Sequence, residues 1–412
     1  MSTQNQFLNT NWVSMEILRM LLNKLVIAEY FNRDWEKEFK KEFAVGSTIT
    51  IKFPWRPSVT DGMGYSPQAI ARLSTTISLD QWLQIGFEWD DYEAAVKLER
   101  SEAELRENYW EPCAAAMAQE YDSRAALWAA NHTSNLVGTL GTDPTTVDTA
   151  YAARQILSEE ACPAGPRVLG WSSSMMRSLG VNLTNIFQPA DEISKLFKEG
   201  SLGRLSGFNV FESQSLWSHT AGTWQGAVTV TGSNQTGGNL IITGTNGDTI
   251  NAGDKFSILN VNKVNPMTRR ISGKKSVRTF TVVTATTLTG GADTIAILPA
   301  IYGPGSAYQN VDALPVTGAA LTLWPGTTSP NGKVGTIGVG LSKYAFALTG
   351  CKLYLPKSTE SAGMAQDPQT GISIRKVKAW DPVRSMQVNR MDSLAGFGDL
   401  YQSNGAVAYA GA

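Results

Sequence analysis

Apolar residues recur at helical spacing close to the start of the chain. Within residues 11–30, Val13, Ile17, Leu21 and Leu25 follow one another at intervals of four. This spacing predicts an amphipathic helix with one wide apolar face. Few Lys or Arg residues stand on its polar side, so we expect the helix to pack against protein rather than lie on a membrane surface.

Two later segments alternate apolar and polar residues, as strands do. They cover residues 47–53 and 73–82 and flank an irregular stretch, 54–72, with three prolines and two glycines. We expect an extended, hairpin-like loop, and a loop of this length is usually functional. Its aromatic and apolar side chains would be costly to leave in water, which predicts contact with a partner. The candidate contact residues are Trp55, Arg56, Met63, Tyr65 and Arg72.

A strong helical pattern follows this loop. Ser101 and Glu104 have the spacing of a capping box, and the segment up to Asn131 is rich in residues that favour helices. A helix of that length would span about 45 Å at 1.5 Å per residue. Pro112 removes one helical hydrogen bond and crowds the preceding turn, so we expect a bend there.

Helical and strand patterns then alternate up to residue 216. The expected helices are 149–161, 172–180 and 190–200, and the expected strands are 167–173 and 208–213. Three glycines near the last helix raise the question of a phosphate-binding loop. Gly200 ends a helix, however, whereas a phosphate loop opens one, and Gly203 and Gly207 fit a tight turn. We therefore interpret these glycines as structural.

The composition changes sharply after Trp217. Only three of the 40 residues in 221–260 are charged, compared with 13 of 40 in 91–130. From 217 to 332, short strand patterns recur about every ten residues between turns, which indicates an all-β sandwich or barrel. Mixed α and β patterns flank this region on both sides, so we interpret it as an insertion. The expected fold class is α+β with an inserted all-β domain.

Net charge and cysteine content argue against several classes of protein. The formal net charge of −1 gives no overall attraction to nucleic acid or an anionic membrane. Three scattered cysteines, Cys113, Cys162 and Cys351, favour neither a disulfide framework nor a metal site, and they suit a reducing compartment such as the cytoplasm. No apolar run approaches the roughly 20 residues that a membrane-spanning helix needs.

The search for catalytic motifs finds none. His132 and His219 have no nucleophile motif beside them, and segment 326–334 lacks the spacing and the hydroxyl of a phosphate-binding loop. We therefore expect no enzyme activity, no cofactor and no metal. One basic cluster near the tip of a predicted hairpin could meet an acidic partner or nucleic acid, although a solvated turn is the simpler interpretation. Its members are Arg269, Arg270, Lys274, Lys275 and Arg278.

Three stretches together resemble the major capsid (coat) proteins of tailed double-stranded DNA bacteriophages. They are 197–216, 251–282, and the pair 371–381 and 390–409. The middle stretch is the most specific, with Ala252, Gly253, Asp254, Asn265, Pro266 and Phe280 in register. The resemblance is to the podovirus-like branch of the Hong Kong ninety-seven-type fold, which carries an inserted β-barrel.

This resemblance implies a division of the chain into named parts. They would be an N-terminal arm (1–43), an extended loop lying over a neighbouring subunit (44–88), a peripheral domain with a spine helix (89–135), a first axial part (136–216), the inserted β-barrel (217–332) and a returning axial and peripheral part (333–412). It also implies pentamers and hexamers in an icosahedral virion shell around packaged DNA, assembled in the host cytoplasm with a scaffolding protein and a portal. Some proteins of this fold crosslink their subunits through an isopeptide bond between an asparagine and a lysine of the extended loop. Residues 53–96 contain no lysine, so we expect no such crosslink here.

Other interpretations remain open at this point. A β-rich phage or bacterial surface or tail protein with a carbohydrate-binding module would explain the Thr- and Gly-rich middle region. It would not explain the long capped helix and the amphipathic N-terminal helix. A hydrolase would need a nucleophile and base pair that the sequence does not offer, and shells of cellular nanocompartments usually lack the inserted domain.

Overall fold

The computed structural model describes most of the chain. The described residues are 10–22, 25–33, 48–57, 59, 61–64, 67–68, 70, 72–90, 106–183, 203–224, 227–271, 275–324, 332–356, 361–366, 372–401 and 406–410. They fall into two compact units, each built from several segments of the chain. The first unit spans 1–51, 76–125 and 347–398, and the second spans 52–75, 126–346 and 399–412. The predicted helix 190–200, with Gly200, and the capping box at Ser101 lie outside the described residues.

An antiparallel sheet forms the frame of the first unit. Its strand order is β18 (Phe346–Gly350), β21 (Met386–Asp399), β20 (Ser373–Asp381) and β19 (Ser361–Gln366), and β3 (Gln81–Asp90) pairs with β21 over ten consecutive residues. β20 confirms the strand predicted for 371–381. The predicted strand 73–82 is instead two strands, because β2 (Ser74–Ser78) ends before β3 begins. β1 (Thr48–Lys52) pairs with β2.

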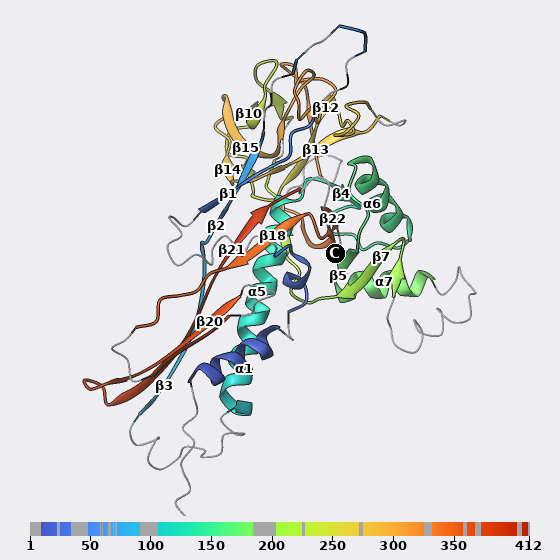
Figure 1. Cartoon of the computed structure of the whole chain (residues 1–412). Coiled ribbons are helices and arrows are strands. Elements are labelled where there is room, and N and C mark those ends of the chain that lie inside the picture. The colour runs from blue at the N-terminus through green and yellow to red at the C-terminus, as the bar shows by residue number, and fades with distance from the viewer. Residues whose placement is uncertain are drawn as a thin grey trace, which may run out of the picture. The chain divides into compact units, whose positions relative to one another are not determined.

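The amphipathic helix predicted for 11–30 is present but shorter, because it ends at Leu22 and Leu25 lies beyond it in irregular structure. Helix α1 (Thr10–Leu22) packs against β19 and β20, and Figure 1 shows it near β20. Ile17, Leu18 and Leu21 are buried. The chain then forms a short 3-10 turn, η1 (Ala28–Tyr30). One side chain binds the backbone of the residues that lead into this turn. Asp122 accepts hydrogen bonds from the backbone nitrogens of Val26, Ile27 and Ala28 at 2.8–3.0 Å.

The long predicted helix is confirmed with a difference at its start. A π-helical turn, η2 (Arg106–Trp110), leads directly into α5 (Glu111–His132). Pro112 is the second residue of α5, and because the π-helical turn continues into α5, its missing N–H removes one backbone hydrogen bond to that preceding turn. The change from π to α geometry falls directly before this proline, the position at which we expected a bend.

The second unit contains a mixed sheet covered by helices. Its order is β4 (Leu136–Val137), β22 (Ala406–Ala410), β17 (Val334–Ser342), β5 (Arg167–Trp171), β7 (Phe208–Glu212) and β6 (Arg204–Leu205), with β8 (Ser218–Thr220) pairing with β17. Helices α6 (Asp148–Glu159) and α7 (Ser173–Leu183) pack residues such as Leu157 and Leu179 on Trp171. Gly203 and Gly207 have φ of 57° and 87°, as a tight turn around β6 requires.

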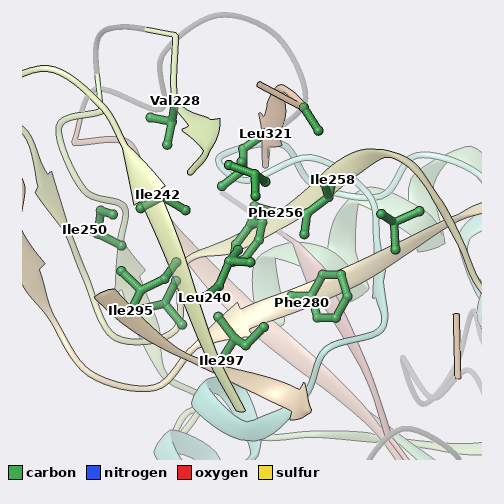
Figure 2. Packing of buried hydrophobic residues seen from close by; sticks show 14 of the residues in the cluster. Val228, Leu240, Ile242, Ile250, Phe256, Ile258, Phe280, Ile295, Ile297 and Leu321 are labelled. Atoms are coloured by element: carbon green, nitrogen blue, oxygen red, sulfur yellow. The ribbon is translucent and has the colours of Figure 1, made fainter. Parts of the chain in front are cut away.

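The predicted all-β region forms a second sheet in this unit. We call residues 227–324 the β region. Its order is β16 (Leu321–Leu323), β12 (Lys255–Asn262), β13 (Val277–Val282), β15 (Asp293–Ile301), β10 (Gly237–Thr243) and β9 (Thr229–Val230), beside the pair β11 (Thr249–Ile250) and β14 (Thr286–Thr287). Phe256, Phe280 and Ile295 belong to its buried core (Figure 2). Hydrogen bonds also join its two edge strands, from Val230 N to Ala319 O and from Leu321 N to Val228 O.

Candidate assembly surface

The base of the extended loop is held by a tyrosine from the β region. The two arms of the loop meet through a hydrogen bond from Phe53 N to Leu73 O of 2.8 Å. The Tyr308 hydroxyl then contacts both arms, because it accepts from Leu73 N at 3.3 Å and donates to Pro54 O at 3.1 Å. The Arg56 guanidinium lies 5.5 Å from the centre of the Tyr308 ring, which adds a cation–π contact.

Arg269 makes the second contact between the β region and the loop base. Its Nη2 donates to Arg56 O at 2.9 Å and to Ala307 O at 3.2 Å. The turn that carries it is organised by Asn265, whose Oδ1 accepts from Met267 N and whose backbone oxygen accepts from Arg269 N. We call Tyr308 and Arg269 the loop clamp.

A groove runs beside the loop clamp. It has a volume of about 590 Å³, and most of its wall is apolar, with two guanidinium groups. Trp55 is half-buried in it, so this predicted contact residue already packs within its own subunit. The other lining residues include Pro54, Pro57, Pro266 and Met267.

The outer part of the loop is exposed. The side chains of Met63 and Val59 are fully exposed, Ile70 is largely exposed, and Arg72 is exposed as well. Tyr65 lies outside the described residues. Met63 and Arg72 are thus exposed, and their contact with another chain stays a prediction, whereas Arg56 packs on Tyr308. Sequence reasoning had not singled out Val59 and Ile70, although they are apolar residues of the same segment.

The basic cluster does not form one surface. Arg278 is only 2% exposed, and its Nη1 lies 2.5 Å from Glu160 Oε1 at the end of α6. Arg269 belongs to the loop clamp, and Lys274 lies outside the described residues. Arg270 and Lys275 are exposed, so the predicted role in contacting a partner stays a prediction for these two side chains.

The two histidines have structural partners. His132 Nδ1 lies 2.6 Å from Asp399 Oδ2, and the Asp399 carboxylate also accepts from Trp128 Nε1. His219 Nε2 lies 2.8 Å from Asp254 Oδ1. Within the described ranges, no group of three or more His, Cys, Asp or Glu side chains is arranged to hold a metal ion. None of the helices described is long and apolar enough to cross a membrane.

Asp254 and Lys255 form a buried node in the second unit. Besides His219, the Asp254 carboxylate accepts from Trp224 Nε1 and from Gly222 N. Lys255 Nζ donates to Ala130 O at the end of α5 and, 2.5 Å away, to Thr133 O. Burial lowers the pKa of Lys255 to about 7, although the neighbouring Asp254 carboxylate acts in the opposite direction.

The position before Asp254 has no room for a side chain, and a glycine, Gly253, occupies it. Its φ is 92°, and a Cβ atom there would lie 2.5 Å from Asn131 Oδ1. Gly253 and Asp254 belong to the stretch that carries the resemblance, and their contacts supply a physical reason for both residues. The alternation of polar and apolar residues had given no sign of the buried charges.

Comparison with known proteins decides the family. A model of the family described as "P22 coat protein - gene protein 5" matches residues 2–396, nearly the whole chain. The chain belongs to the P22 coat protein family. It is the major capsid protein of a tailed double-stranded DNA bacteriophage, forms the capsid shell and is part of the virion. This match does not favour the alternative of a surface or tail protein with a carbohydrate-binding module.

Solved structures give weaker likenesses to this coat protein. A chain from Mycobacterium phage Che8 is 14% identical, with 93% of this chain and 90% of that chain covered and a TM-score of 0.49. The "Capsid of Ralstonia phage GP4" is 7% identical, with 99% and 92% covered and a TM-score of 0.48. The "Capsid structure of the Cyanophage P-SCSP1u" is 11% identical, with 89% and 84% covered and a TM-score of 0.42. No curated protein sequence matches the chain.

Proposed function

We propose that this coat protein has the Hong Kong ninety-seven-type fold with an inserted β-barrel. On this proposal the β region is the barrel, and the hydrogen bonds between β9 and residues 319–321 close its sheet. The parts named in the sequence analysis, from the N-terminal arm to the returning axial part, would be its subdomains. We propose further that the chain has no enzymatic role.

The proposed assembly is an icosahedral shell of pentamers and hexamers around packaged double-stranded DNA. Rings of five and six need heterologous contacts, in which two different surfaces of one chain meet. The formal charge of −1 suits a wall that encloses DNA without binding it tightly. A scaffolding protein and a portal would take part, in the host cytoplasm.

The observation that carries the proposal is the exposed outer part of the extended loop. Val59, Met63 and Ile70 present apolar side chains that the described part of the chain leaves uncovered. Prolines stiffen this segment, which lowers the entropy lost when it is ordered against a neighbour. We propose that Met63 and Arg72 contact a second copy of the chain, together with Tyr65.

The test replaces the exposed methionine and follows both folding and assembly. Met63→Ser should leave the free energy of unfolding within about 0.5 kcal/mol of the original, because the side chain is fully exposed. It should reduce the yield of closed shells in sedimentation velocity and negative-stain microscopy. Met15→Ser, at an exposed methionine of α1, is the matched control. Equal shell yields for all three proteins would contradict the proposed contact.

A further inference from the structure

The contacts at the loop base point to a positioning role for the β region. Residues 54, 56 and 73 of the loop arms are bound by side chains from two separate turns of the β region, around Arg269 and Tyr308. Both side chains hold backbone atoms of the loop. The contact therefore fixes where the loop arms run and does not depend on the loop's own side chains.

We propose that Tyr308 and Arg269 are positioning residues for shell assembly. They set the direction in which the extended loop leaves the β region and so orient its exposed apolar side chains. The proposal rests on the proposed function, because orientation matters only if the outer loop contacts a second copy. It assigns the β region a role within its own subunit, as a support for the loop.

The hydrogen bonds of the loop clamp fix the positions of both loop arms. The Tyr308 hydroxyl accepts from one arm and donates to the other, so a single O–H group fixes the spacing of both arms. Arg269 Nη2 bridges Arg56 O on the loop and Ala307 O in the β region, beside Tyr308 in sequence. A ring of five or six copies closes only if each copy presents its contact surface at the same angle. A small rotation of the loop base would therefore disturb closure.

Two conservative variants, each with a matched control, test the proposal in the full chain. Tyr308→Phe removes the hydroxyl and keeps the ring beneath Arg56. Tyr302→Phe makes the same change at a tyrosine on the wall of the neighbouring cavity, where no hydroxyl hydrogen bond occurs within the described residues. Arg269→Lys keeps the charge but loses the planar guanidinium. Arg270→Lys makes the same change at the exposed neighbour.

The first readout is hydrogen exchange of the Leu73 amide in unassembled subunits. Tyr308→Phe should speed this exchange by about five- to ten-fold, because the amide loses its acceptor. Tyr302→Phe should leave it unchanged. The second readout is the product of assembly under microscopy. Tyr308→Phe and Arg269→Lys should lose closed shells as the main product and give open or irregular sheets, whereas both controls should form closed shells.

Each outcome decides one point. Faster Leu73 exchange with normal closed shells would overturn the positioning role, and unchanged exchange would overturn the clamp itself. A change in thermal midpoint cannot mimic the expected result, because assembly is compared at temperatures where every variant is folded. Failure of the unaltered chain to form shells, both alone and with its scaffolding protein, would overturn the proposed function and, with it, this inference.

Discussion

Two buried basic side chains lie where the β region packs on helices of the second unit. Arg278 pairs with Glu160 at the end of α6, and Lys255 binds backbone oxygens at the end of α5. A carbonyl-rich helix C-terminus favours a nearby cation, and a buried arginine requires a carboxylate partner. These two side chains therefore fix the β region against specific helix ends.

The buried pair gives a prediction at the scale of single residues. Glu160→Gln leaves Arg278 as a buried charge without its carboxylate, which typically costs about 3–5 kcal/mol. Denaturant unfolding, followed by a probe of the second unit, should show this loss. Adding Arg278→Met to the same variant should recover part of it, because the unpaired charge is then removed.

A solvent-exposed salt bridge provides the control for the Glu160→Gln experiment. Glu120 and Arg124 lie one helical turn apart on α5, with their side chains partly in water. Glu120→Gln should change the free energy of unfolding by about 0.5 kcal/mol or less. A loss for Glu160→Gln as small as this would contradict the importance assigned to the buried pair.

Lys255 gives a prediction for pH dependence. Its pKa is about 7 in the folded chain, while an unfolded lysine has a pKa near 10.4. Between these values the unfolded chain binds a proton that the folded chain lacks, so this group makes stability rise with pH from about 7 to about 10. Lys255→Met should reduce the slope of unfolding free energy against pH by up to about 1.4 kcal/mol per pH unit. An unchanged slope would contradict the assigned pKa.

At the scale of elements, one carboxylate secures the chain that follows α1. Asp122, on α5, is almost fully buried and accepts three backbone N–H groups from Val26, Ile27 and Ala28. The Ile27 and Ala28 donors are buried and would otherwise lack a partner, at a cost of about 1–3 kcal/mol each. A single side chain thereby joins the short turn η1 to the long helix within the first unit.

The anchor can be tested by a change of one functional group. Asp122→Asn places an NH2 group against a backbone N–H, so we expect a loss of about 1–3 kcal/mol in the free energy of unfolding. Hydrogen exchange at Val26 to Ala28 should become faster. The exposed Asp61→Asn is the control and should do neither. Unaltered exchange at these amides would show that the anchor is not needed.

The elements that the sequence predicts well are those with a clean period. The four-residue spacing of Ile17 and Leu21 predicted α1, and alternation predicted β20. The break between β2 and β3 was missed, because the alternation of 73–82 continues through the break. The π-helical turn before Pro112 was also missed, since it uses ordinary helix-forming residues.

The assembly surface was only partly predictable. Arg56 was predicted as a contact residue, yet its role depends on Tyr308 and Arg269, about 200 or more residues further along the chain. No local pattern reports a contact over such a separation. Arg278 shows the same limit, because its charge suggested exposure while its partner Glu160 lies on another element.

At the scale of the whole molecule, the two ends of the extended loop differ: its base is bound within the subunit, and its outer part is exposed. The base of the extended loop is bound by the β region, and its outer residues Val59 and Met63 are exposed. Apolar side chains in this arrangement favour burial by a neighbouring copy, at roughly 25 cal/mol for each Å² covered. Repeated around a ring, many modest contacts of this kind can hold a shell together.

The most direct test is a cryo-electron microscopy reconstruction of particles assembled from this chain. The account predicts an icosahedral shell of five- and six-membered rings, with Met63 of each copy covered by the next copy and Tyr308 still bound to its own loop base. Particles in which Met63 faces solvent, or rings joined without the extended loop, would contradict it.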